Sequence, residues 1–321
     1  MNLTDDDIAR GREAETPSAI PARGLKDVMW RVWKSLAQDH VMLIAGGVTF
    51  YLLLALFPAL VAFMSVYGIF FDPATAVDQA QSLRGLLPPA VVDVIADQLA
   101  RLTSTQGGTL TFGLIVSLLI AFWSANGGVK AIIEGLNFAY SEREKRSFVR
   151  LNLVAFAFTL GAMALMLLMI VVLAVMPAIL ALLRLGTMEV VVLGLLRWPL
   201  LVLFLGVALT LLYRHGPSRR PAEWRWVTWG SGFATISWLI VSIAFTTYLD
   251  RFANFDATYG ALAAPIGFLL WVWLSIIVII LGGEINGELE HQTAADTTTG
   301  PDRPMGKRGA VMADTLGAPS D

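Results

Sequence analysis

Six long apolar runs alternate with polar connectors along this chain of 321 residues. The runs cover roughly residues 41–71, 110–125, 151–176, 198–213, 227–249 and 261–281. The longer runs reach about twenty residues with almost no charge, the length that an α-helix needs to cross a bilayer core. Backbone groups in lipid find no water, so each run must close its own hydrogen bonds as a helix. The pattern predicts an all-α polytopic membrane protein with six transmembrane helices.

An amphipathic helix is predicted just before the first run. Apolar side chains recur there at i, i+3, i+4, i+7, i+8 and i+11, the spacing of one helical face, in Leu25, Val28, Met29, Val32, Trp33 and Leu36. Basic side chains occupy the other faces, with Trp30 at the border. We expect this helix to lie in the headgroup layer, with Trp30 and Trp33 at the membrane interface.

The connector at about 72–108 carries a second apolar stripe after Pro88 and Pro89. Asp93, Asp97 and Arg101 follow each other at i, i+4 and i+8, where they can pair along one helix face. Two close carboxylates could instead bind a metal, but a solvated, salt-bridged face needs no ligand. We interpret the segment as a helical cap on the outer side of the membrane domain.

The two ends of the chain are polar and poor in large apolar residues. Such composition cannot bury enough apolar surface to offset the entropy of ordering. The sequence therefore predicts a disordered cytoplasmic tail at 1–22, a membrane domain at 23–292 and a second disordered tail at 293–321.

Lysine and arginine orient the domain. One set of flanking segments holds Arg23, Lys26, Arg31, Lys34, Lys130, Arg143, Lys145, Arg146, Arg150, Arg214, Arg219, Arg220 and Arg225, whereas the opposite set holds only Arg84, Arg101, Arg184, Arg197 and Arg251. Basic connectors stay in the cytoplasm, so both termini are predicted inside and the protein multi-pass in a bacterial inner membrane. Anionic headgroups at the cytoplasmic face are the expected partners, and we assign to that interface Arg143, Lys145, Arg146, Arg219 and Arg220.

The amino-acid composition limits the kinds of catalytic and metal sites that the chain can form. Hydrophobic residues make up 56% of the chain and charged residues 15%, below the roughly one quarter that is usual in soluble domains. The chain has no cysteine, and its three histidines lie in separate connectors or tails. We therefore expect no catalytic residues, no metal, no cofactor and no enzymatic activity.

Two of the runs, 110–125 and 198–213, are short for a span, and Asn126-Gly127-Gly128 follows the first. Short or interrupted spans point to a substrate path in transporters. The alternative is that flanking residues extend both helices into the interface.

Polar residues gather at the predicted cytoplasmic ends of the spans. We predict one site there for a headgroup or a coupling ion, formed by Asn126, Lys130, Glu134, Glu284 and Asn286. Ionisable groups within spans are costly and are often functional. The competing interpretation is that these charges are solvated helix ends, with the neighbouring glycines serving helix packing.

Several runs together resemble the YihY/BrkB family of bacterial inner-membrane proteins. They are AGGVTFYLLLALFP at 45–58, FWSANGGVK at 122–130, LNFAYSEREKR at 136–146, LYRHGPSR at 212–219, TYG at 258–260 and LGGEINGELE at 281–290. The resemblance implies a six-helix inner-membrane protein. Members carry a historical ribonuclease BN label, regarded as misassigned, and a virulence label, and a role in handling envelope lipids has been suggested for relatives.

Two classes of function remain open. The first is a transporter or flippase-like carrier of lipids or amphipathic solutes, which a cavity between helices would favour. The second is a scaffold for envelope proteins, with a homo-oligomer or another envelope protein as partner. Nucleic acid is not expected as a partner, because the acids that metal-dependent RNA hydrolysis would need lie mostly in the predicted outer segment.

Overall fold

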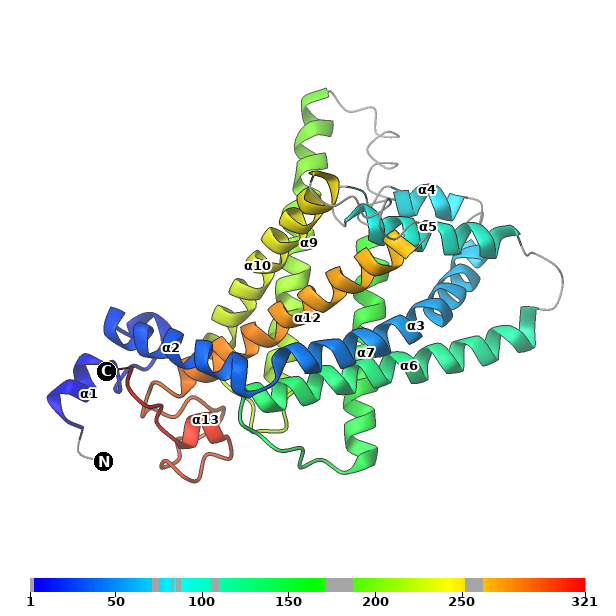
Figure 1. The fold of residues 1–321 in the computed structure, drawn as a ribbon. Helices are drawn as coiled ribbons and strands as arrows, with labels where there is room; N and C mark the ends of the chain where they lie inside the picture. Colours follow the sequence, from blue (N-terminus) through cyan, green and yellow to red (C-terminus); the bar gives the residue numbers. More distant parts are fainter. Residues whose placement is uncertain are drawn as a thin grey trace.

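The computed structural model describes residues 3–70, 75–81, 84, 88–104, 110–170, 187–251 and 262–320, and this part of the chain is mostly helical (Figure 1). An isolated antiparallel bridge joins Ala222 to Thr298. The helices are α1 (Asp5–Ala9), η1 (Pro17–Ala19), α2 (Ala22–Gln38), α3 (Val41–Phe70), α4 (Ala76–Gln81), α5 (Pro89–Ser104), α6 (Leu110–Ala139), α7 (Phe148–Ile170), α9 (Thr187–His215), α10 (Trp224–Arg251), α12 (Ala263–Glu290) and α13 (Val311–Asp314). The all-helical fold that the apolar runs predict is confirmed.

Three helices of the described chain are long and apolar enough to cross a membrane. They cover Phe148–Leu165, Trp224–Leu249 and Ala263–Glu290. A fourth span results if the bent pair Ala22–Leu36 and Val41–Leu56 is counted as one. These helices mark an integral membrane protein.

The two runs that look short in the sequence belong to long helices. α6 continues through Asn126-Gly127-Gly128 for 30 residues, and α9 runs for 29 residues with Pro199 inside it. The glycines allow α6 to lie against α3, because a side chain at Gly127 or Gly128 would press on Tyr51 or Leu52. Helix extension, rather than a broken span, therefore describes both runs.

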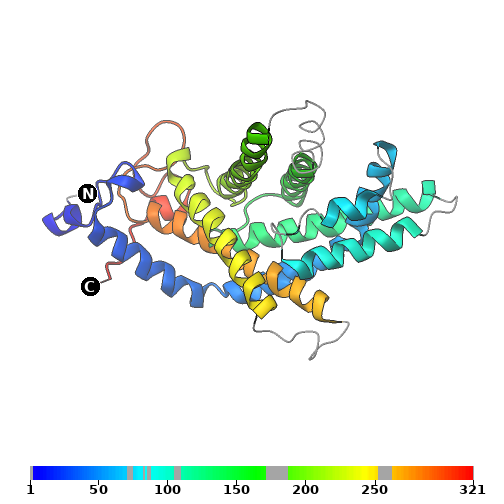
Figure 2. The ribbon, with the colours of Figure 1, turned by 90° about the horizontal axis from the view of Figure 1, so that it is seen from above.

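α12 forms the centre of the bundle. It contacts α10 on one side and α3, α5 and α6 on the other, and α3 and α6 run side by side along their length (Figure 1). Seen from above, α7 and α9 are viewed nearly end-on at one flank, whereas α3 and α6 extend across the picture (Figure 2). The steep crossing leaves α7 and α9 standing beside the main bundle.

The α10–α12 interface is the most polar contact between two spans. Asn286 accepts a hydrogen bond from Gly230 N at 2.7 Å and donates one to Val227 O at 3.1 Å. A side chain at Gly230 would clash with the backbone oxygen of Gly282. Glycine therefore lets the two helices approach closely, and the Asn286 amide fixes their register.

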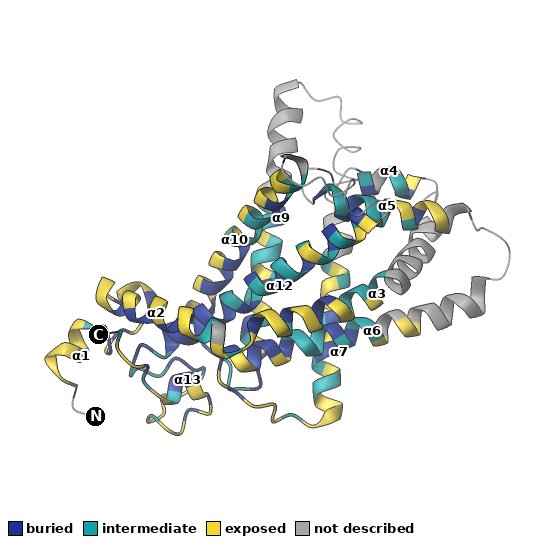
Figure 3. Ribbon diagram, in the orientation of Figure 1, coloured by how far each residue is buried: buried dark blue, intermediate teal, exposed yellow. Residues whose placement is uncertain are grey.

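α2 meets α3 at a sharp break. The two helices bend by 61°, and His40 between them has a φ of 50°, a left-handed conformation uncommon in non-glycine residues. The residues of the predicted apolar stripe of α2 differ in burial. Val28 and Val32 are buried in the protein, whereas Trp33 is 78% exposed, as the blue and yellow sides of the helix show (Figure 3).

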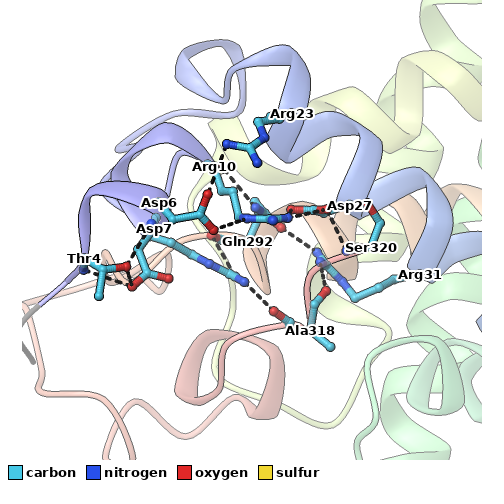
Figure 4. A network of polar contacts seen from close by, with 12 residues as sticks. Thr4, Asp6, Asp7, Arg10, Arg23, Asp27, Arg31, Gln292, Ala318 and Ser320 are labelled. Atoms are coloured by element: carbon cyan, nitrogen blue, oxygen red, sulfur yellow. Dashed lines mark hydrogen bonds and ion pairs between the residues drawn. The ribbon is translucent and has the colours of Figure 1, made fainter.

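Both polar ends of the chain are folded in the structure, unlike the disordered tails that their composition predicts. Arg10 pairs with Asp27 of α2 at 3.0 Å, and the Asp27 carboxylate also accepts Ser320 N at 2.8 Å (Figure 4). Arg31 donates to Ala318 O, and Arg308 donates to four backbone carbonyls within the C-terminal segment. Buried arginines hold these segments in place together with a few buried apolar side chains, such as Ile20 and Met312, and composition does not register the arginine contacts.

Candidate functional site

A cleft of about 990 Å³ lies between α6, α7 and α9. Its volume is at the upper end of the about 300–1,000 Å³ range of small-molecule pockets. The floor is apolar and is formed by Val129, Ile132, Val154, Ala157, Phe158, Gly161, Ala162, Leu165, Ala208, Leu209, Leu211 and Leu212. Such a floor suits a hydrocarbon chain rather than a polar solute.

The mouth of the same cleft is strongly basic. α7 begins and α9 ends there, so the connectors that precede α7 and follow α9 place their cations around one opening. The basic lining residues are Lys145, Arg146, Arg150, Arg214, Arg219 and Arg220, joined by His215. No aspartate or glutamate of the described chain lines the cleft. Apolar floor and cationic mouth together match the two halves of an anionic amphiphile.

A hydrogen-bonded frame holds the two connectors together. The buried Asn137 side chain accepts Ser218 N at 2.7 Å and donates to Glu144 at 3.2 Å. Lys145 N donates to Ser218 Oγ at 3.0 Å, and Arg146 donates to Gly216 O at 2.8 Å. The opening is therefore built by specific contacts between connectors that are about 70 residues apart in the chain.

Three of the cations at the mouth are already neutralised by carboxylates. Lys145 pairs with Glu142 at 2.7 Å, Arg146 with Glu144 at 2.7 Å and Arg219 with Glu290 at 2.5 Å. Burial raises the pKa of the Glu144 carboxyl, but hydrogen bonds from Arg146 and Asn137 lower it by more. The resulting pKa is about 2. These pairs are part of the frame and leave little charge for a ligand.

The other three arginines, Arg150, Arg214 and Arg220, have no carboxylate partner among the described residues. Arg214 stacks on Trp224, 3.8 Å from the ring centroid. Its Nε atom is buried and has no hydrogen-bond partner in the described structure, and the same holds for Nη1 of Arg220. Buried donors without acceptors cost free energy, so these two N–H groups are available to an acceptor on a ligand.

The structure divides the polar site predicted from the sequence into separate places. Asn126 and Lys130 meet at Asn152 of α7, whose side-chain oxygen accepts from them at 2.9 and 3.2 Å. Glu134 is exposed, and Asn286 faces α10 as described above.

Glu284 lies apart from both groups. Its side chain is fully buried and accepts no hydrogen bond within the described chain. Asp39, at the break between α2 and α3, and Glu288 are the carboxyl groups that interact with it. Among the described residues, no three His, Asp or Glu side chains are placed to hold a metal ion together.

The residues assigned to the membrane interface also differ in their surroundings. Trp30, Trp33, Arg143 and the Lys145 side chain are exposed. Arg219, by contrast, is 2% exposed and bound to Glu290, so it lies inside the protein. Arg146 and Arg220 line the cleft.

Sequence reasoning did not assign Arg150, Arg214 or Asn152 to the site. The two arginines appear in the sequence only as part of the basic connectors. Asn152 does carry a signal, because it is an amide at the start of an otherwise apolar run, and polar groups in spans usually find a partner.

Comparison with known proteins identifies the family. A family model described as virulence factor BrkB matches residues 32–306. The chain belongs to the BrkB family. This result confirms the resemblance found in the sequence, and no solved structure matches the chain.

Relatives within the BrkB family carry uninformative names. A Bacillus subtilis (strain 168) protein, YfkH, is 33% identical over 77% of this chain and 90% of its own length, and its name describes it only as ribonuclease-like. A UPF0761 membrane protein of Rhodospirillum centenum is 26% identical over 97% of this chain and 68% of its own. Another, from Janthinobacterium sp., is 25% identical over 80% of this chain, which spans 58% of that protein.

Proposed function

We propose that this BrkB-family protein carries lipids or amphipathic solutes within a bacterial inner membrane, as a six-span protein with both termini in the cytoplasm. The observation that supports the proposal is the cleft, which joins an apolar floor to a cationic mouth with unpartnered donors. The proposed role is binding and transfer of a ligand, not catalysis.

The proposal explains why the basic residues surround one opening. Basic connectors of a membrane protein lie on the cytoplasmic side, where anionic headgroups are enriched. A lipid whose headgroup rests at Arg150, Arg214 and Arg220 would lay its chain along α7 and α9. A scaffold needs no such internal cleft, and RNA would find an aliphatic floor behind the basic residues.

Two glycines allow a matched test. Gly161 lines the cleft, whereas Gly232 lies on α10 away from it, and a methyl group at either position meets no atom within 4 Å. Gly161→Leu should therefore narrow the cleft, and Gly232→Leu should add the same side chain elsewhere. Both variants are reconstituted into liposomes and tested for transfer of a fluorescent anionic lipid between leaflets.

We expect transfer by the wild type and by Gly232→Leu, and its loss in Gly161→Leu. Equal transfer by both variants would show that the cleft is not the route. If the wild type neither transfers nor binds lipid, the carrier proposal is wrong and the scaffold remains.

A further inference from the structure

We infer that the cleft selects a dianionic headgroup, namely that of a lipid phosphate monoester, an inference that rests on the carrier function proposed above. Three features of the mouth point to such a headgroup: its charge balance, the geometry of its donors and, among the described residues, the lack of an unpaired acid in its lining.

The mouth of the cleft carries a positive charge that a ligand can balance. With Lys145, Arg146 and Arg219 paired to glutamates, the mouth keeps the charge of Arg150, Arg214 and Arg220. A carboxylate or a phosphate diester brings one negative charge, whereas a phosphate monoester brings about 1.5 to 2 at neutral pH. The monoester comes closest to balancing three cations that no carboxylate of the described residues neutralises.

The number of N–H donors at the mouth also favours a phosphate monoester. Guanidinium groups present planar forks of N–H donors that match the oxygens of a phosphate, often in pairs. A monoester has three terminal oxygens to accept them, one more than a diester. At the mouth, the buried Nε of Arg214 and the buried Nη1 of Arg220 are donors without acceptors in the described chain.

The surroundings of the mouth disfavour zwitterionic headgroups. An ethanolamine or choline group needs a carboxylate or an aromatic cage for its ammonium. Each glutamate near the mouth, Glu142, Glu144 and Glu290, already binds a basic side chain, and the face of Trp224 is covered by Arg214. A zwitterionic lipid would bring a positive charge next to three unpaired arginines.

The test measures the binding of four probes to the full chain in micelles of an uncharged detergent. Binding is followed by native mass spectrometry and by thermal shift. The probes are dioleoyl phosphatidic acid, dioleoyl phosphatidylglycerol, dioleoyl phosphatidylethanolamine and inorganic phosphate. They separate monoester, diester, zwitterion and free anion. A short RNA oligonucleotide serves as a competitor.

We expect phosphatidic acid to bind at least tenfold more tightly than phosphatidylglycerol, and inorganic phosphate to compete only weakly because it cannot fill the apolar floor. The double variant Arg150→Gln/Arg220→Gln should lose this preference. Arg23→Gln, which removes an exposed cation from α2, should keep it. The melting temperature without lipid shows whether each variant is folded.

Equal binding of monoester and diester, blocked in both cases by Gly161→Leu, would overturn the inference and leave the carrier proposal intact. Lack of binding by all three lipids would overturn both. Saturation by inorganic phosphate alone would assign the mouth to a soluble anion, and displacement of phosphatidic acid by RNA would assign it to nucleic acid; either result contradicts the inference.

Discussion

Arg31 offers the sharpest test of how the tails are held. Its Nε donates to Glu288 Oε2 at 2.5 Å, Nη2 donates to Glu288 O at 3.2 Å and to Gln292 Oε1 at 2.8 Å, and Nη1 donates to Ala318 O at 2.9 Å. Both side chains of the Arg31–Glu288 pair are almost fully buried. Replacing Arg31 with Met leaves the Glu288 carboxylate buried, with His291, at 3.4 Å, as its remaining basic neighbour among the described residues.

Removal of one partner from a buried ion pair costs about 3–5 kcal/mol. An exposed pair contributes about 0–1 kcal/mol. The Arg23–Asp6 pair is of the second kind, with both side chains more than half exposed. We therefore expect Arg31→Met to lower the melting temperature by on the order of 10 °C, and Arg23→Met to leave it nearly unchanged.

The assay is thermal unfolding in detergent, followed by the fluorescence of the ten tryptophans. The double variant Arg31→Met/Glu288→Met removes both charges and should recover part of the loss, because no buried charge is then left unpaired. Equal melting temperatures for Arg31→Met and Arg23→Met would refute the reasoning. A double variant as unstable as the sum of its two single variants would refute it too.

Three further predictions use other parts of the structure. Gly230→Ala should sharply reduce the yield of folded protein because its methyl group meets the backbone of α12, whereas Gly232→Ala, in open space, should be neutral; equal yields would contradict the close helix contact. Since the folded pKa of Glu144 is held near 2, its stabilising effect is complete above the usual carboxyl pKa and declines as the pH falls towards 2. The difference in melting temperature between wild type and Glu144→Gln should thus shrink between pH 7 and pH 3, and a constant or growing difference would count against the ion pair. The predicted topology can be tested with single cysteines at the exposed positions Asp97 and Arg143. In intact cells an impermeant reagent should label the cysteine at Asp97 and not the one at Arg143; the reverse pattern would show that the opposite topology is correct.

The helices could be predicted because their signal is local. An apolar run of span length must be helical in lipid, whatever surrounds it. The extent of α6 could not be predicted, because Gly127 and Gly128 resemble a stop signal until α3 is known to lie against them. A packing requirement and a helix end look alike in a single sequence.

The site was harder to predict because it depends on helix rotation as well as on position along the chain. Glu284 and Asn286 are two residues apart, and at about 100° per residue they point to nearly opposite sides of α12. One faces the break between α2 and α3, and the other faces α10. Convergence of the connectors at Arg150 and Arg220 is a tertiary property, and nothing in the sequence places α7 next to α9.

The hydrogen-bonded contact between α10 and α12 has a mechanical consequence. The backbones of the two helices approach closely at Gly230, and Asn286 joins them by two hydrogen bonds in a low-dielectric environment, so separating them would break both bonds. α7 is tied differently: in the described part of the chain, Asn152 provides its polar link to α6. Any widening of the space beside α7 would therefore strain a single amide rather than the central pair. Under the carrier function proposed above, cargo would be exchanged by a motion of the α7 side of the bundle against the α10–α12 pair.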